Sequence, residues 1–349
     1  TITASAITGI MRAGPEHRVA VPLTLPKDLA PQVGGLEVEA SGAAMGVTWT
    51  LKAITLPGLG AQVLARTVQD RLDRVVAEMS TWEPASHISA FNRAPAGAWQ
   101  DLPEGFAQVM ACALSMAALG QGAFDPTVGR VTDLWGFGPP GPVAVPPTDA
   151  MVDEARAQAG WTRLDFDPVG RRLRQPGGLG LDLSGIAKGF GVDEAAHALL
   201  RLGVRDFLLE VGGELRGEGL KPDGQPWWVA LERLEGEVEG QAPILLALCG
   251  QSVATSGDYR RYMIHEERRL AHTLDPRTGR PSESGVACVS VLHAQAMVAD
   301  AWCTLLSVVG AEEGLALCAA HDIPARFLVH TKRGLEERLS PAFQALLED

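Results

Sequence analysis

Apolar segments of two different periodicities alternate along this chain of 349 residues. Residues 62–79 and 104–119 place their apolar side chains near one face of a helix, as amphipathic helices do. Short apolar runs such as 207–211 and 286–292 are typical of buried strands. Because these elements interleave without strict β-α-β alternation, the sequence predicts an α+β (mixed α/β) fold.

The other expected elements complete this order. Strands are expected at residues 43–54, 179–183, 227–231, 244–248 and 325–329, and helices at 149–159, 185–202, 295–309, 312–321 and from Pro341 onward. Residues 1–40 are rich in Pro, Gly and Ala and are interpreted as an extended arm or linker, which leaves residues 41–349 for the folded domain. The first 20 residues lack the basic and apolar regions of a signal peptide.

The net charge of −12 argues against a nucleic-acid partner, because such a partner requires clustered Lys and Arg. No stretch reaches the roughly 20 apolar residues that cross a bilayer. The five cysteines show no C-x-x-C spacing, so a zinc site is not expected.

A candidate phosphate site lies where the strand at 179–183 passes through Ser184 and Gly185 into a helix. A helix start offers unpaired backbone N–H groups and a positive dipole end, both of which suit phosphate. Lys188, one of only five lysines, could add a point charge there. A capped helix with a solvated lysine would give the same pattern.

A candidate cation site lies further along the chain. Asp300 and Thr304 are four residues apart on an expected helix and therefore share a face, where a carboxylate and a hydroxyl could bind one hard cation. The alternative is an ordinary buried Asp with a Thr bonded to its own backbone.

Three further positions present groups that could meet a ligand. His272 could bind an acidic substrate or transfer protons, and Trp82 could stack on a flat ring. The segment Gly122–Thr127 is a tight polar turn. Each of these features also occurs without any function.

Taken in order, these segments resemble the ApbE family of FAD:protein FMN transferases. The matching motifs are Met45-Gly46-Val47-Thr48, Met79-Ser80-Thr81-Trp82, Ser86-x-x-Ser89-x-Phe91-Asn92, Gly122-Ala123-Phe124-Asp125-Pro126-Thr127-Val128-Gly129, Leu134-Trp135-Gly136-Phe137-Gly138, Asp182-Leu183-Ser184-Gly185-Ile186-Ala187-Lys188-Gly189, Gly212-Gly213-Glu214, Ala254-Thr255-Ser256-Gly257-Asp258-Tyr259, His272-x-x-Asp275-Pro276-Arg277-Thr278-Gly279 and Ala299-Asp300-Ala301 with Thr304. They cover roughly residues 43–346.

The resemblance implies a fold with a central cleft between two subdomain-like halves, with FAD bound in the cleft and Mg²⁺ beside it. By resemblance, the FAD site consists of Met45, Trp82, Ala123, Phe124, Asp125, Asp182, Lys188 and the backbone near Leu274. The implied metal ligands are the Gly185 carbonyl, Asp300, Thr304 and position 303, which is Cys303 here and often Ala or Asp in the family. Position 82 is often Tyr in the family, and Trp82 keeps the flat ring but lacks the hydroxyl.

The implied reaction is Mg²⁺-dependent transfer of FMN from FAD to a Ser or Thr of a target protein, with release of AMP. His272 is the expected base, and Asp300 and Asp258 are the alternatives. An FAD pyrophosphatase that releases free FMN, or a flavin carrier without catalysis, would use the same site. The family suggests membrane redox subunits or a nitrous-oxide-respiration regulator as acceptors, and a periplasmic location.

Overall fold

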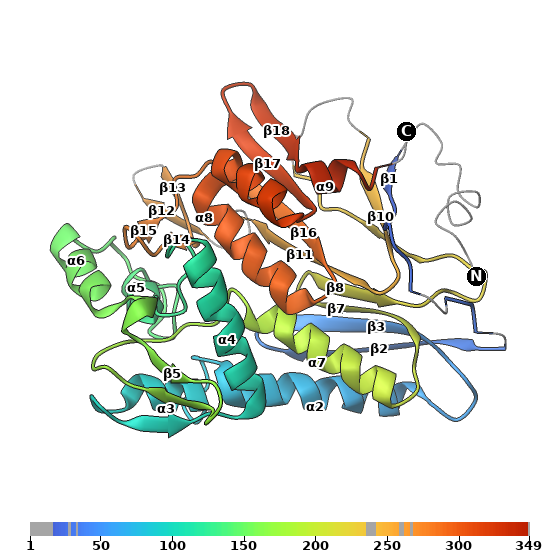
Figure 1. The fold of residues 1–349 in the computed structure, drawn as a ribbon, viewed down its shortest axis with the longest axis horizontal. Coiled ribbons are helices and arrows are strands. Elements are labelled where there is room, and N and C mark those ends of the chain that lie inside the picture. The colour runs from blue at the N-terminus through green and yellow to red at the C-terminus, as the bar shows by residue number, and fades with distance from the viewer. Residues whose placement is uncertain are drawn as a thin grey trace.

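An eight-stranded antiparallel sheet forms the centre of the molecule (Figure 1). The computed structural model describes residues 17–26, 29–32, 34–234, 242–257, 262–265 and 268–347, with the backbone alone at 262–265 and 268–270. The strand order is β18-β17-β16-β11-β8-β7-β3-β2. These strands are β2 Leu36–Ala44, β3 Val47–Thr55, β7 Asp206–Val211, β8 Glu214–Glu218, β11 Gln251–Gly257, β16 Val286–His293, β17 Ala325–Thr331 and β18 Gly334–Leu339.

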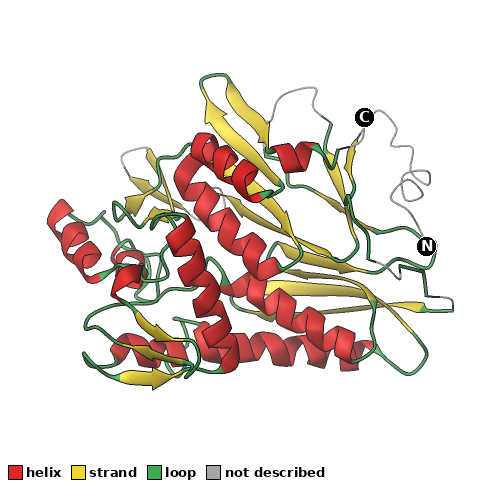
Figure 2. Cartoon of the chain, viewed as in Figure 1, coloured by secondary structure: helices red, strands yellow, loops and turns green. Residues whose placement is uncertain are grey.

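Helices cover one face of this sheet (Figure 2). They are α2 Ala61–Met79, α7 Ala187–Arg201 and α8 Ala296–His321, and α4 Glu104–Leu119 packs on α2 and α8. Alternate residues of the strands point at the helices, so Leu51 and Phe207 are buried against Leu64, Leu72 and Leu199. Period-2 strands packed on period-3.6 helices thus build the core between the two layers.

A second, smaller sheet packs on the opposite face. It consists of β1 Arg18–Ala20, β10 Ile244–Leu248 and β9 Trp227–Ala230, and the short helix α9 Pro341–Gln344 lies beside it. Ile54, Leu246 and Phe343 are among the side chains buried there. The segment interpreted as an arm over residues 1–40 therefore contains β1 and the start of β2, while its residues 1–16 lie outside the described part of the chain.

The remaining elements form the other half of the molecule. They are α3 His87–Arg93, α5 Gly129–Leu134, α6 Asp149–Gln158, the 3₁₀ helix η1 Trp161–Arg163, a sheet of β4 Trp99–Asp101, β6 Arg172–Arg174 and β5 Asp165–Asp167, and the hairpins β12 Tyr262–His265 with β13 Arg268–Ala271 and β14 Leu274–Asp275 with β15 Arg280–Pro281. The predicted mixed α+β architecture is confirmed.

Several local predictions need correction. The single strand expected at 43–54 is the hairpin β2–β3, which turns at Met45 and Gly46 with φ of 56° and 73°. Residues 179–183 join no sheet, and only Gly180 makes an isolated bridge. Helix α7 begins at Ala187 rather than directly after Gly185.

Helix α8 joins the two helices expected at 295–309 and 312–321 across a kink at Gly310, where φ is 85°. By length and composition it is the one helix in the described part of the chain that could cross a membrane, contrary to the expectation that no segment is apolar enough. Half of its most apolar window is nevertheless buried inside the protein, and it packs along β11 and β16. Its apolar character is explained by its place in the core.

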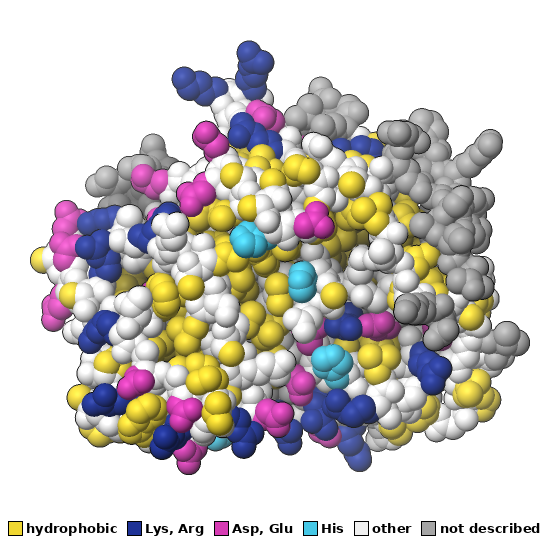
Figure 3. Space-filling model, in the orientation of Figure 1, with side chains coloured by type: hydrophobic (Ala, Val, Ile, Leu, Met, Phe, Trp, Pro, Cys, Tyr) yellow, Lys and Arg dark blue, Asp and Glu magenta, His cyan; other side chains and the backbone are white. Residues whose placement is uncertain are grey.

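The surface of the molecule separates hydrophobic from charged side chains on the face that carries the helices. In Figure 3, hydrophobic side chains gather in the centre of the face that carries α4 and α8, and charged side chains lie mostly around its rim.

Candidate active site

A cavity of about 450 Å³ brings together segments that are far apart in the sequence. The end of α2, the loop after α4, the turn before α7, the end of β11, the start of β14 and the first turns of α8 all line it. Its lining includes every residue predicted for the FAD site: Met45, Trp82, Ala123, Phe124, Asp125, Asp182, Lys188 and Leu274. Gly185, His272, Asp300 and Thr304 line it as well, whereas Asp258 lies outside the described residues.

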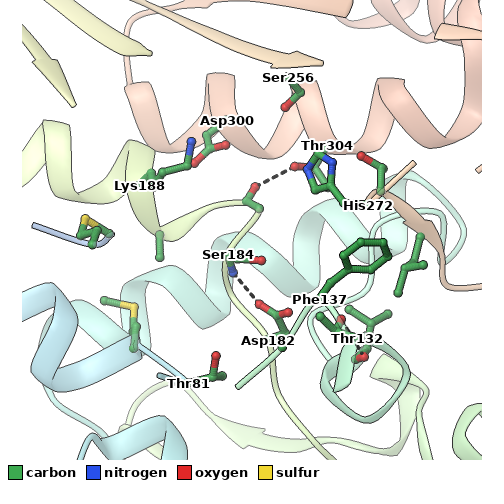
Figure 4. A pocket seen from close by; sticks show the side chains of 18 of the residues that line it. Thr81, Thr132, Phe137, Asp182, Ser184, Lys188, Ser256, His272, Asp300 and Thr304 are labelled. Carbon is green, nitrogen blue, oxygen red and sulfur yellow. Dashed lines mark hydrogen bonds between the residues drawn. The ribbon is translucent and has the colours of Figure 1, made fainter. Parts of the chain in front are cut away.

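The turn before α7 is held in place by side-chain contacts. Asn92 bonds both backbone groups of Leu181, donating to its carbonyl at 2.9 Å and accepting from its N–H at 2.7 Å. The carboxylate of Asp182 accepts from the Ser184 N–H at 2.8 Å, as Figure 4 shows. These bonds fix the approach of residues 181–185 to the cavity without a regular strand.

Gly185 allows this turn to touch α8. The Thr304 hydroxyl donates to the Gly185 carbonyl at 3.1 Å (Figure 4). A Cβ at position 185 would lie only 2.7 Å from that hydroxyl oxygen, which is closer than real Cβ contacts come. The absence of a side chain is therefore what lets the two oxygens meet.

Asp300 is the carboxylate nearest this contact along α8. Its side chain is buried, with the residue 3% exposed, and Oδ2 accepts from the Gly189 N–H at 2.9 Å. Burial raises the pKa of Asp300, while the positive charge of Lys188 and the Gly189 hydrogen bond act in the opposite direction. Figure 4 shows Lys188 and Asp300 reaching toward each other, and the Lys188 ammonium also lies 2.7 Å from Glu214 Oε1.

These oxygens suit a hard divalent cation. Mg²⁺ binds oxygen at about 2.1 Å in an octahedron, so neighbouring ligands lie about 3 Å apart. The Gly185 carbonyl and the Thr304 hydroxyl, at 3.1 Å, match that separation. Across the described residues, no group of three or more His, Cys, Asp or Glu side chains is placed to hold a metal, so this mixed set of one carboxylate with neutral oxygens favours Mg²⁺ over Zn²⁺.

Cys303 does not reach the cavity with its side chain. Its thiol is fully buried on another face of α8, 3.2 Å from the Ala254 carbonyl and 3.6 Å from that of Val289. Burial raises the pKa of this thiol well above its usual value, so a thiolate ligand is disfavoured. The Cys303 carbonyl accepts from the Ser307 hydroxyl. The structure thus places the Cys303 thiol away from Gly185, Asp300 and Thr304, so a part for position 303 in the metal site could come only from its main-chain carbonyl.

Aromatic and histidine side chains also line the cavity. Trp82 is 58% exposed there, so its ring is available to a ligand. The ring of His272 meets Phe137 edge to face at 6.4 Å between centroids. The hairpin that follows His272 is anchored by Trp135, whose Nε1 donates to the Gly279 carbonyl at 2.8 Å.

Asp125 has a structural part in the site. One carboxylate oxygen accepts from the N–H and hydroxyl of Thr127, and the other accepts from the Trp161 N–H. Burial raises its pKa. Asp125 therefore shapes the cavity wall by holding the turn at 122–127.

The prediction of site residues left out some that the structure brings to the cavity. Glu214 is not among the lining residues, but it accepts from the Lys188 ammonium and stands, without a predicted role, in the matched motif Gly212-Gly213-Glu214. Thr81, Thr132 and Ser256 do line the cavity. Isolated hydroxyl residues carry no sequence signal of their own, because Ser and Thr are common in every loop.

Comparison with known proteins agrees with this arrangement. The model of the ApbE family matches residues 45–327. The FAD:protein FMN transferase of Vibrio cholerae is 36% identical over 316 residues, which cover 89% of this chain and 93% of that protein. The one from Haemophilus influenzae is 32% identical and covers 89% of this chain and 92% of its own length.

Two solved structures share the fold. The flavinyl transferase ApbE of Pseudomonas stutzeri, in its apo form, superposes with a TM-score of 0.83 at 36% identity and covers 89% of this chain and 97% of its own. The flavin transferase ApbE of Vibrio cholerae gives a TM-score of 0.81 at 35% identity, with 90% and 100% covered. Sequence, fold and cavity agree, and this chain belongs to the ApbE family.

Proposed function

We propose that this protein transfers the FMN half of FAD to a Ser or Thr hydroxyl of an acceptor protein, with Mg²⁺, and releases AMP. The observation that carries the proposal is the meeting, in one cavity, of the Gly185 carbonyl, the Thr304 hydroxyl and the buried Asp300 carboxylate beside Lys188. The relatives that carry the name FAD:protein FMN transferase support the donor and the type of product.

The bonds balance as follows. The acceptor oxygen forms a bond to the phosphorus of the FMN portion, the bond between that phosphorus and the bridging oxygen breaks, and AMP leaves with the bridging oxygen. The hydroxyl proton passes to a base. His272 lines the cavity and is the proposed base, and Asp300 is the alternative within the described residues.

Residues of the cavity could offset the negative charge that opposes this reaction. A diphosphate repels a nucleophile, and negative charge builds on the leaving group. Lys188 places a positive charge at the start of α7, where the positive end of the helix dipole also favours anions. Gly185, Asp300 and Thr304 would hold Mg²⁺, which, when bound, would neutralise diphosphate oxygens.

The flavin end of the donor has a candidate binding surface at Trp82. An exposed indole at the cavity mouth can stack on an isoalloxazine ring. Met45 and Phe124 supply apolar surface in the same cavity, which suits a flat, largely apolar ring system.

Product analysis tests the proposal. The protein is incubated with FAD, Mg²⁺ and a candidate acceptor, and the flavin is followed by in-gel fluorescence and chromatography. Covalent flavin on the acceptor supports transfer, free FMN supports a pyrophosphatase, and flavin binding without either product supports a carrier. Asp300→Ala should abolish both products without abolishing flavin binding, and a product yield unchanged by EDTA would contradict the role of Mg²⁺.

The acceptor and the compartment are proposed on the family resemblance. Membrane redox subunits and a nitrous-oxide-respiration regulator are the first acceptors to test, and the periplasm is the proposed location. Fractionation of the native host with an antibody against the protein decides the location, and loss of flavin from one host protein after gene deletion identifies the acceptor.

A further inference from the structure

Helix α8, which carries Asp300 and Thr304, does not cap its own start. Its N-cap residue Gln295 makes no side-chain capping bond, and its first turn contains no acidic residue. Exposed N–H groups at a helix start need acceptors. Here a residue of another helix supplies them: Asp193 of α7 accepts from the Ala296 N–H through Oδ1 and from the Met297 N–H through Oδ2, both at 2.9 Å.

Asp193 is itself buried and held by charge. It is 6% exposed, and Arg216 of β8 donates to its Oδ1 at 2.8 Å. The same Arg216 donates to the Ala294 carbonyl, just before α8, and bonds Glu218 through two nitrogens. Buried ion pairs add little net stability, but their geometry is specific because a misplaced partner leaves a charge uncompensated.

A second contact joins the two helices one turn further on. Gly189 lies four residues before Asp193 on α7, and its N–H donates to Asp300, which lies four residues after Ala296 on α8. The helices are so close there that a Cβ on Gly189 would lie 2.2 Å from the Ala296 carbonyl oxygen. Asp193 and Gly189 therefore tie α8 to α7 at two successive turns.

We propose that Asp193 is a positioning residue for the cation site. It holds the first turn of α8 against α7, so that Asp300 and Thr304 keep their place relative to Gly185 and Lys188. A shift at Ala296 would move Asp300 by a similar amount, because one rigid helical turn separates them. This inference rests on the proposed function, since it assigns a role within the proposed Mg²⁺ site.

The competing explanation is that Asp193 only stabilises the fold. A matched control variant distinguishes this explanation from a role in positioning the cation site. Asp206 is also a buried aspartate, 5% exposed, and its Oδ1 accepts from the Leu220 N–H at 2.9 Å, which ties β7 to the residues after β8 rather than to α8. Asp193→Asn and Asp206→Asn each weaken one buried carboxylate. Both variants should lower the urea midpoint, and only Asp193→Asn should weaken cation binding.

Direct binding of Mn²⁺, followed by electron paramagnetic resonance in the presence of FAD, gives a readout besides activity. Loss of a partner that orients metal ligands typically weakens metal binding about 10- to 100-fold. We expect a shift of that size in the Mn²⁺ dissociation constant of Asp193→Asn and in its half-saturating Mg²⁺ concentration. A Mn²⁺ dissociation constant for Asp193→Asn equal to that of Asp206→Asn would overturn the inference.

Restoring a cap from within α8 makes the test independent of folding. Gln295 has the extended backbone of an N-cap (φ −116°, ψ 127°), and Asp is among the best N-cap residues. The double variant Asp193→Asn with Gln295→Asp should regain stability but keep the weak Mn²⁺ binding, because the tie to α7 is still missing. Recovery of Mn²⁺ binding together with stability would show that Asp193 acts only as a cap. If wild-type protein bound no Mn²⁺ and transferred FMN without Mg²⁺, the proposed function itself would fail instead.

Discussion

Thr304 offers the sharpest test of the cation site, because Val matches its shape and lacks only the hydroxyl. In Thr304→Val the bond of 3.1 Å to the Gly185 carbonyl disappears. A typical hydrogen bond contributes about 0.5–1.5 kcal/mol net, so without metal the free energy of unfolding should fall by about 1 kcal/mol. The fold itself should survive, because Thr304 is only half-buried.

The effect on the cation should be larger than the effect on stability. Leaving one polar partner unmatched costs about 1–3 kcal/mol, and each 1.4 kcal/mol is tenfold in binding. The half-saturating Mg²⁺ concentration for FMN transfer should therefore rise by about 5- to 150-fold in Thr304→Val. Thr304→Ser keeps the oxygen and loses one methyl group, so it should lose up to about 0.8 kcal/mol of stability and retain the wild-type Mg²⁺ dependence.

The assay is a Mg²⁺ titration of covalent flavin formation at saturating FAD, with unfolding by urea measured in parallel on EDTA-treated protein. Equal Mg²⁺ dependence of the Val and Ser variants would refute the hydroxyl as a ligand. A shift in both variants that matched their losses of stability would refute it as well, since the cause would then be packing rather than the oxygen.

Three further predictions follow from single contacts. Trp82 is exposed in the cavity, and stacking on an aromatic ring is worth about 0.5–1.5 kcal/mol. Trp82→Ala should therefore weaken FAD binding about 2- to 10-fold in a fluorescence titration, and Trp82→Phe much less. Equal losses of FAD affinity in the two variants would exclude stacking. Trp135→Phe leaves the buried Gly279 carbonyl without its indole donor and should cost about 1–3 kcal/mol in urea unfolding, so an unchanged unfolding free energy would contradict this. Burial raises the pKa of Glu337, but the hydrogen bonds and charges of Arg18 and Arg326 outweigh it and leave the pKa below 4.5. The stability that Glu337 contributes is therefore present above pH 4.5 and lost as the pH falls through the folded pKa. Glu337→Gln should cost about 3 kcal/mol at pH 7, and its melting temperature should approach that of wild type only as the pH falls through that folded pKa.

The long helices could be predicted from the sequence because their periodicity is strong. The helix expected at 104–119 has those bounds in the structure, and the one expected at 62–79 begins one residue earlier. The strands β8, β11 and β18 were not predicted, since their sequences are polar or charged, and tertiary partners bury most of β8 and β11 while β18 is an edge strand. Arg216 in β8, for example, is buried because Asp193 and Glu218 compensate its charge.

The site was predictable as a set of residues but not as a geometry. Motif order placed Gly185, Asp300 and Thr304 together, and helical spacing explains why the last two share a face. The same spacing explains why Cys303 does not, because residues 303 and 304 lie 100° apart around a helix. The apolar residues 179–183 predict a strand before the turn at Ser184 and Gly185, yet side-chain bonds from Asn92 to Leu181 rather than a sheet hold this segment.

Two aspartates on adjacent helices show what only the structure could separate. Both Asp193 and Asp300 are buried, and only the spacing of Asp300 to Thr304 marks one of them in the sequence as a candidate ligand. Asp193 uses both oxygens, accepting two helix N–H groups and an Arg216 hydrogen bond, which is the pattern of a carboxylate that fixes structure. Asp300 accepts from the Gly189 N–H, lies beside Lys188, lines the cavity and has its pKa raised by burial. Burial makes the charged form of this carboxylate unfavourable, and a cation bound in the cavity would offset that desolvation cost. Cation binding should accordingly stabilise the packing of α8 against α7, which Asp193 also holds through its bonds to the first turn of α8.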